Sequence, residues 1–125
     1  MTINPYLCVR DTHAALDWYV AVFDGTITHQ PIVMDDGRVG HSEVTIGDTP
    51  LMVSDEFESA GVAPPDAGRG SPVTLMLRPV DVDDVVGRAE RSGARITRGP
   101  EDDGDVRLAV LIDPFGHRWF LRSAG

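Results

Sequence analysis

The sequence predicts an α+β fold built from two βαβββ units, and three observations support this prediction. Each half of the chain reads as one strand, one helix and three further strands. The halves match at a constant offset, because the stretch from Leu7 to Gly25 repeats from Leu75 to Gly93, 68 positions later. With 125 residues and 42% apolar content, the chain can build a core of domain size. Such a repeat indicates two copies of one supersecondary unit that bury a face together.

The first half begins with a strand around Leu7 and Val9, where apolar residues alternate with others. Asp11 or Thr12 then offers a helix N-cap, because apolar side chains recur at helical spacing after them. Gly25 stands where that helix is expected to stop. The three strands expected next cover residues 26–34, 39–46 and 50–54, separated by turns at 35–37 and 47–48.

The second half repeats this order. Asp81 caps a helix that Gly93 ends, and the DPFG sequence forms the last turn. We therefore expect a single domain, residues 1–125, made of two modules joined by a connector rich in Gly, Pro and Ala. The expected strands cover residues 73–77, 94–97, 107–112 and 118–122, with a loop at 99–105; the modules cover about 1–55 and 72–125, and the connector covers 56–71.

Charge and composition argue against several classes of partner. A formal net charge of −9 disfavours nucleic acids and anionic membranes, which basic patches recognise. The acidity would suit a cationic ligand, or it serves solubility alone. No apolar run approaches the roughly 20 residues that span a bilayer. The single cysteine, Cys8, excludes an intramolecular disulfide, and the first ten residues lack a signal-peptide pattern, so we expect a cytoplasmic protein.

Three stretches resemble the vicinal oxygen chelate superfamily, which includes glyoxalase I, fosfomycin-resistance proteins, extradiol dioxygenases and bleomycin-resistance proteins. YLCVRDTHAALDWYVAVFDG is similar to the first strand and helix of that family, DGRVGHSEVTIGDTPLMVSDE to its hairpins, and DPFGHRWFL to its terminal hairpin. The DGRVGH and IGD segments look most like the small glyoxalase-like branch. The resemblance implies paired βαβββ modules that curl into half-barrels, a ligand or metal in the cup, and a homodimer.

The resemblance also implies where a metal centre would lie. Metal-dependent members use His, Gln or Glu side chains from the first and last strands of each module. Carried over by position, and by the offset of 68, these places fall on Asn4, Met52, Pro72 and Phe120. Three of the four offer no side-chain oxygen or nitrogen, and an asparagine alone cannot make a site. We therefore expect no metal and no other cofactor.

Alternation along the strands assigns the side chains that line the cup. The opposite set is wholly apolar, which suits a core packed on the helices. That core set is Leu7, Val9, Val44, Ile46, Leu51, Val53, Val73, Leu75, Leu77, Trp119 and Leu121. The residues expected to line the cup and contact a ligand are Tyr6, Cys8, His41, Glu43, Met52, Ser54, Thr74, Met76, Arg107, Phe120 and Arg122, with Leu111 beside them.

Two polar features admit both a functional and a structural interpretation. His117 follows the DPFG turn, and the turn chemistry of Asp113, Pro114 and Gly116 explains that stretch without a catalytic histidine. His41 and Glu43 share one strand face, so they could act as an acid/base couple or as ligands of an unconventional metal site. They could equally form a polar pair at the cup rim.

The leading hypothesis is a metal-independent protein that sequesters a small organic molecule in a largely apolar cup, as bleomycin-resistance proteins do. The alternative is a lyase, isomerase or dioxygenase of the same superfamily that uses His41 and Glu43, or a displaced metal site. A third hypothesis is a regulatory or structural dimer without a ligand.

Overall fold

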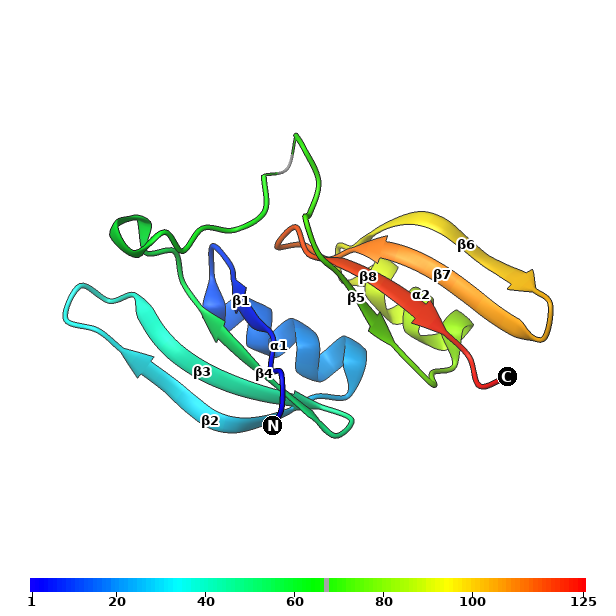
Figure 1. The fold of residues 1–125 in the computed structure, drawn as a ribbon, viewed down its shortest axis with the longest axis horizontal. Coiled ribbons are helices and arrows are strands. Elements are labelled where there is room, and N and C mark those ends of the chain that lie inside the picture. The colour runs from blue at the N-terminus through cyan, green and yellow to red at the C-terminus, as the bar shows by residue number, and fades with distance from the viewer. Residues whose placement is uncertain (67) are drawn as a thin grey trace. The chain divides into compact units, whose positions relative to one another are not determined.

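A computed structural model describes residues 1–66 and 68–125, so Ala67 of the expected connector lies outside the described residues (Figure 1). The chain divides into two compact units, Met1–Pro64 and Pro65–Gly125, called here the first and second modules. The first contains β1 (Tyr6–Cys8), α1 (Thr12–Phe23), β2 (Thr26–Val33), β3 (Val39–Ile46) and β4 (Thr49–Ser54), followed by a 3-10 turn at Glu58–Ala60. The second contains β5 (Thr74–Leu77), α2 (Val82–Arg91), β6 (Arg95–Asp103), β7 (Val106–Ile112) and β8 (Arg118–Arg122). The predicted βαβββ order is confirmed in both modules.

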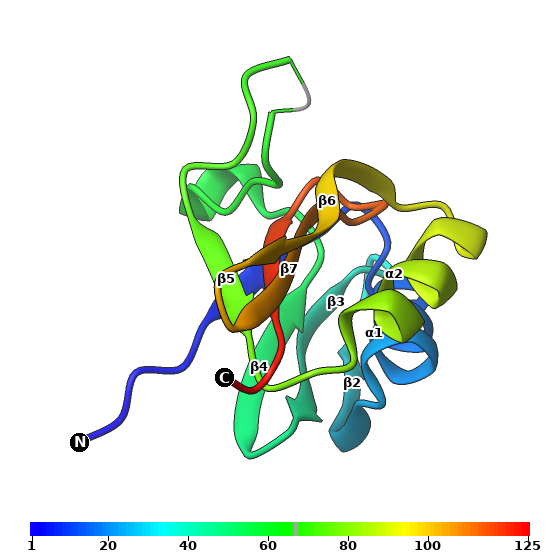
Figure 2. The same ribbon diagram turned by 90° about the vertical axis from the view of Figure 1, so that its right-hand side faces the viewer.

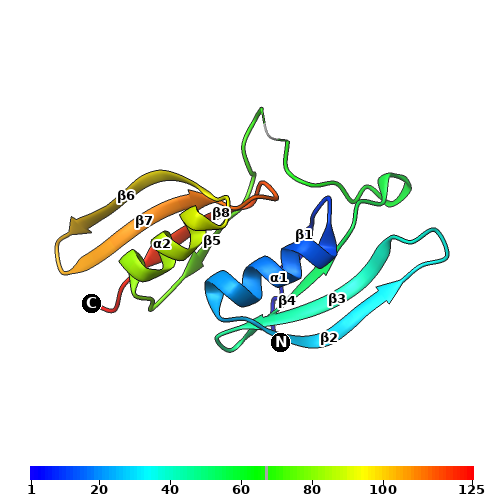
Figure 3. The same cartoon turned by 180° about the vertical axis from the view of Figure 1, so that it is seen from behind.

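In each module the first strand pairs with the last strand, at one edge of a four-stranded sheet. The strand orders are β1-β4-β3-β2 and β5-β8-β7-β6, and the β1–β4 and β5–β8 pairs are parallel. In Figure 3 each helix lies in front of its own sheet, and Figure 2 shows α2 on one side of β7. The sheet face toward the module's own helix is called the helix face, and the opposite one the cup face. No helix in the described ranges is both long and apolar enough to cross a membrane.

Both helices begin at the predicted aspartates. The Asp11 carboxylate accepts a hydrogen bond from Ala14 N at 3.1 Å, and Asp81 accepts one from Asp84 N at 3.2 Å. At the other end of α1, the left-handed residue is Asp24, with φ of 57°, rather than Gly25. Gly25 is needed for a different reason, because a Cβ there would stand 2.9 Å from Val44 Cγ2. The glycine therefore allows close packing of the helix end on β3.

The helix face forms the core, with one correction to the predicted set. Most of the expected residues are buried, including Leu7, Val44 and Trp119. Val73, however, is 61% exposed, and Leu75 and Leu77 on β5 are only partly buried. The reason is positional, because β5 is an edge strand that starts one residue after Val73. An edge strand has a neighbour on one side only, so its side chains are less completely covered.

The predicted places of Arg107 and Leu111 on the cup face are wrong. Leu111 pairs with Trp119, and directly paired residues point to the same side of a sheet, so Leu111 lies on the helix face. The Arg107 guanidinium binds Asp83 of α2, which puts it on the helix side as well. Their neighbours Leu108 and Val110, which pair with Arg122 and Phe120, take the cup face instead.

The length of one turn explains this error. Between paired Ile112 and Arg118 the chain has five residues, whereas between paired Thr45 and Pro50 it has four. The extra residue changes the offset between the halves from 68 to 67 on β7, and a change of one residue exchanges the two faces of a strand. β6 also runs further than predicted, to Asp103, so the expected loop at 99–105 is largely strand.

The longer turn is built around the buried carboxylate of Asp113. Its Oδ1 accepts hydrogen bonds from Phe115 N at 2.9 Å and His117 N at 3.0 Å, and its Oδ2 accepts one from Trp119 Nε1 at 2.9 Å. Gly116 supplies the left-handed conformation, with φ of 97°. These contacts match the turn chemistry that the sequence predicted for Asp113 and Gly116. Asp113 thus links the turn to the core tryptophan.

Replacing Asp113 with alanine should lower the free energy of unfolding by about 3 kcal/mol, because three donors lose their acceptor in a buried place. Urea denaturation measures this change. Two control variants set the scale: Asp81→Ala, which removes an exposed helix cap, and His117→Ala should each cost about 1 kcal/mol or less. A loss of under about 1 kcal/mol for Asp113→Ala would show that the turn does not depend on this carboxylate.

Candidate functional site

The cup face of the first module brings together side chains from three strands. Strand pairing places Tyr6 of β1 beside Met52 of β4, and Met52 beside Glu43 of β3. His41 joins this row from the same strand as Glu43, since its ring nitrogen contacts the Tyr6 hydroxyl. Tyr6 is half exposed and His41 and Glu43 are partly buried, so the row is open to solvent. All four of these expected residues therefore lie on one accessible surface.

Tyr6 and His41 form the best-defined polar contact on this face. The Tyr6 hydroxyl lies 3.0 Å from His41 Nδ1 and donates to the Gly40 carbonyl at 3.1 Å. When the phenol proton points to Gly40, the phenol oxygen can accept from Nδ1, and a neutral His41 in that tautomer has Nε2 as its acceptor nitrogen. Burial raises the pKa of Tyr6, which keeps the phenol protonated at neutral pH.

His29 of β2 joins the same cluster, although the sequence analysis did not identify it. Its ring lies edge-on to that of His41, with centroids 5.2 Å apart, and its Nδ1 is 2.8 Å from the Gln30 carbonyl. Thr28, the preceding residue, donates to the Glu43 carboxylate and lies 2.9 Å from the Thr45 hydroxyl. Two consecutive residues can face the cup because the β2–β3 pairing shifts register here. A bulge of this kind leaves no pattern in the sequence from which His29 could be placed.

A second irregularity occurs on β3 beside His41. Glu43 is paired with Met52, while the Asp55 amide donates to the Val39 carbonyl. From Val39 to Glu43 the chain advances four residues, whereas from Met52 to Asp55 it advances three, so β3 holds one extra residue in this interval. Bulges change the direction of a side chain, and this one accompanies the approach of His41 to Tyr6.

The places that the resemblance assigned to a metal do not suit one. Met52, Pro72 and Phe120 carry no oxygen or nitrogen donor, and the amide of Asn4 donates to the Pro50 carbonyl at 3.2 Å. Over residues 1–66 and 68–125, no three His, Cys, Asp or Glu side chains are grouped closely enough to hold an ion. His41 and Glu43 are therefore not part of such a group among the described residues.

The second module has a cavity of about 450 Å³ on its cup face. Three of the expected residues line it: Met76 of β5 and Phe120 and Arg122 of β8. Thr74 does not; its hydroxyl accepts a hydrogen bond from Arg118 at 2.7 Å. The other lining residues, which the sequence did not place in the cup, are Asp103, Asp105, Val106, Leu108 and Gly125. Leu108 was missed because of the register error on β7.

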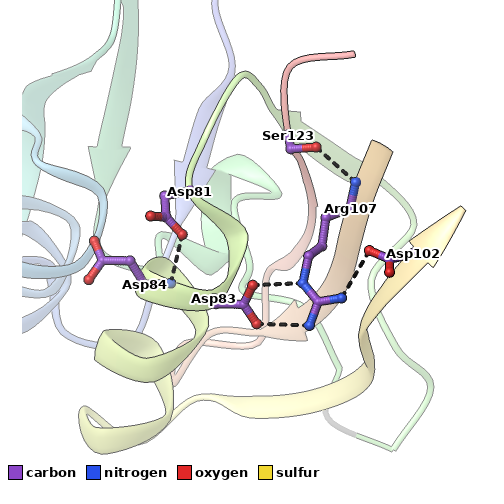
Figure 4. Close-up of polar contacts among 6 residues, drawn as sticks. All are labelled: Asp81, Asp83, Asp84, Asp102, Arg107 and Ser123. Carbon is purple, nitrogen blue, oxygen red and sulfur yellow. Dashed lines mark hydrogen bonds and ion pairs between the residues drawn. The ribbon is translucent and has the colours of Figure 1, made fainter. Parts of the chain in front are cut away.

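Arg107, expected in the cup, is instead engaged on the helix side (Figure 4). Its guanidinium donates to both carboxylate oxygens of Asp83, at 2.6 and 3.0 Å, and to Asp102 at 3.0 Å. The hydrogen bonds from these two carboxylates raise the pKa of the Arg107 side chain. The backbone amide of Arg107 separately donates to the Ser123 hydroxyl at 2.8 Å. The arginine thus connects α2, β6 and β7 and is not directed at a ligand.

Cys8 and Ser54 lie on the cup side of paired strands but are buried, at 7% and 2% exposure. The Ser54 hydroxyl donates to the Asp55 carbonyl at 3.0 Å. Burial, followed by the negative charges of Glu56 and Asp55, raises the pKa of Cys8 to about 11. A thiol with so high a pKa is a poor nucleophile at neutral pH, because the thiolate is the reactive form.

Comparison with known proteins identifies relatives over nearly the whole chain. The family model described as Glyoxalase/Bleomycin resistance protein/Dioxygenase superfamily matches residues 2–121. An uncharacterized protein of Mycobacterium bovis is 34% identical, matching 95% of this chain and 80% of its own length.

Solved structures share the fold at lower identity. The PhnB protein from Bacillus cereus superposes with a TM-score of 0.76 at 18% identity, covering 99% of this chain and all of that one. The fosfomycin resistance protein FosX from Mesorhizobium loti gives a TM-score of 0.71 at 16% identity, covering all of this chain and 92% of that one.

Cys8 should resist alkylation in the folded protein. At pH 8 a thiol of pKa about 11 is about one part in a thousand thiolate, against about a quarter for a thiol of pKa 8.5. Reaction with iodoacetamide, followed by mass spectrometry, should therefore be at least about 100-fold slower than for the same protein in urea. Equal rates in the two states would contradict the described burial of Cys8.

Proposed function

Because the chain belongs to the glyoxalase/bleomycin resistance protein/dioxygenase superfamily, we propose that it binds a small organic molecule in a cup without the help of a metal. One observation carries this proposal. Phe120 stands at the last-strand position where metal-dependent relatives would place a donor, and its side chain lines a cavity of about 450 Å³. A phenyl ring at that place favours an apolar group and excludes a coordinated ion.

The composition of the cavity supports binding of an organic molecule. Its apolar residues are Met76, Val106, Leu108 and Phe120, beside a few charged side chains. Small-molecule pockets usually have volumes of about 300–1,000 Å³ and combine mostly apolar walls with few polar groups. The apolar residues therefore favour an organic body, and the charged residues favour polar groups on it.

Capture without reaction is the leading form of this function. The described residues that line the cavity include no serine, cysteine, histidine or lysine nucleophile. Cys8 is buried, and its raised pKa keeps it protonated. The expected homodimer stays a prediction.

An acid/base enzyme is the second candidate, and the Tyr6–His41 contact of 3.0 Å favours it. A neutral His41 whose Nδ1 proton is held by Tyr6 presents Nε2 as a general base. The phenol of Tyr6 would keep the imidazole in that tautomer, and Glu43, held by Thr28, would keep a negative charge nearby. Proton abstraction next to a carbonyl, in an isomerase or lyase, is the reaction this arrangement suits.

A library of small organic compounds, screened by thermal unfolding in the presence of EDTA, tests the proposal. We expect at least one compound to raise the melting temperature, with no further gain when Zn²⁺, Ni²⁺ or Mn²⁺ replaces the chelator. Phe120→Ala should abolish the shift, whereas the matched change Phe57→Ala, in the connector region of the first module, should leave it intact. Mass spectrometry should recover the bound compound chemically unchanged.

Two results would contradict capture without metal. Stabilisation that appears only with a divalent cation would show that binding needs a metal. Conversion of the compound by the wild-type protein, lost by at least about 100-fold in His41→Gln, would support the acid/base candidate instead.

A further inference from the structure

The cavity of the second module holds charges of both signs. We infer that it selects a zwitterionic organic molecule, with an apolar body, a carboxylate-type anion and an ammonium-type cation. This inference rests on the proposed function and names the class of ligand. It uses three charged side chains of the cavity wall, Arg122, Asp103 and Asp105, and the apolar surface between them.

Arg122 provides the site for the anion. Its side chain lines the cavity, and within the described part of the chain no carboxylate lies within ion-pair distance of it. Other guanidiniums are engaged: Arg98 pairs with Glu101, and Arg107 with Asp83 and Asp102. A partly buried guanidinium that faces a cavity without a partner suits a carboxylate, which it can bind through two parallel hydrogen bonds.

Asp103 and Asp105 provide the site for the cation. They lie at the end of β6 and in the turn before β7, and both line the same cavity as Arg122. No lysine or arginine among residues 1–66 and 68–125 pairs with either of them. Asp102, which lies between Glu101 and Asp103, points to the opposite side and binds Arg107. The alternation of strand side chains thus directs Asp103 to the cup face.

The opposite charges lie far enough apart to hold a ligand between them. Arg122 is paired with Leu108, and Leu108 with Glu101, so two strand spacings separate β8 from β6. At about 4.8 Å per spacing, the α-carbons of Arg122 and Glu101 lie roughly 10 Å apart, and Asp103 lies two residues further along β6. Among the described residues no ion pair joins Arg122 to Asp103, and both side chains line the cavity.

The surface near these charges is apolar. Met76, Leu108 and Phe120 contribute a thioether, a branched alkyl group and a phenyl ring to the wall. A flat ring suits this surface, because it can stack on Phe120 and contact the Met76 sulfur. The ligand therefore needs an apolar, preferably aromatic, body in addition to its two charges.

Other charge types fit the cavity less well. A simple cation would meet Asp103 and Asp105 but approach Arg122 without a counterion, and a simple anion would have the reverse disadvantage. A neutral molecule would leave all three charged groups without a partner. The net charge of −9 alone suggests a cationic ligand, but the residues that line the cavity favour a molecule carrying both charges.

The described strands of the first module do not repeat this charge pattern at the corresponding positions. Met52 pairs with Tyr6 as Phe120 pairs with Met76, so Ser54, two residues after Met52, corresponds to Arg122, two residues after Phe120. Similarly, Glu43 pairs with Met52 where Val110 pairs with Phe120. The two cup faces thus differ in chemistry. Substitutions in the second module should alter zwitterion binding, whereas substitutions in the first module should not.

Four compounds with the same indole ring test the inference: tryptophan, tryptamine, indole-3-propionate and 3-ethylindole. Calorimetric titration at low ionic strength should show that tryptophan binds about tenfold more tightly than each of the others, since it alone can satisfy both charge sites. Raising the salt concentration to 0.5 M should reduce this difference, because screening weakens exposed charge pairs.

Variants assign each charge to its site. Arg122→Gln should reduce tryptophan affinity to that of tryptamine, Arg122→Lys should retain part of it, and the Asp103→Asn, Asp105→Asn double variant should reduce it to that of indole-3-propionate. Tryptophan affinity should stay unchanged in two controls with the same changes in net charge. These are Arg95→Gln, at an exposed place on β6, and the double variant Asp17→Asn, Asp35→Asn in the first module. Melting temperatures establish that each variant is folded.

Two outcomes would overturn the inference. One is equal or tighter binding of tryptamine, indole-3-propionate or 3-ethylindole; the other is no measurable binding of tryptophan at millimolar concentration. Either result leaves the proposed function standing if the chelator-treated screen yields a ligand of another class. If that screen yields no ligand while tryptophan also fails to bind, both the inference and the proposed function are wrong.

Discussion

The parallel pairing of the first and last strands is the constraint on which the rest of each module depends. It sets Tyr6 beside Met52 in the first module and Met76 beside Phe120 in the second. Because strand side chains alternate, fixing these pairs also fixes which residues face the helix. Apolar residues such as Leu51 fill that face, and the other face is left for a ligand. The cup is thus a consequence of how the core is closed.

Local sequence signals predicted most of the fold. The bounds of β3 and β8 follow from the turns beside them, and the helix starts follow from Asp11 and Asp81, whose carboxylates cap the first turns. These features depend on a few neighbouring residues, so a sequence contains enough information to place them. The apolar alternation likewise identified the helix face of β4 and β8.

The candidate site was less predictable, because it depends on register between strands. A single extra residue in the turn around Asp113 moved Arg107 and Leu111 to the helix face and brought Leu108 to the cavity. The bulge on β2 added His29 to the first cup. Both effects arise from the register of hydrogen bonding between neighbouring strands, which turn length and bulges determine. Neither could be read from alternation within one strand.

The use of arginine distinguishes the two sides of the second module. On the helix side, Arg107 has two carboxylate partners and contributes to the structure. On the cup side, Arg122 faces a cavity. An arginine whose charge is matched within the fold gains little from a ligand, whereas an unmatched one at a cavity wall can recognise an anion. Local pairing, rather than net charge, therefore determines the ligand chemistry that each face favours.

The central claim, that an organic molecule binds on the cup face without a metal, can be tested most directly by NMR of methionine methyl groups. Met76 lines the cavity, while Met34 packs near Gly40 on the β2–β3 hairpin and serves as an internal control. With ¹³C-methyl methionine and EDTA present, a compound that stabilises the protein should shift the Met76 signal and leave Met34 in place. A Met76 signal that stays fixed until a divalent cation is added would contradict the account.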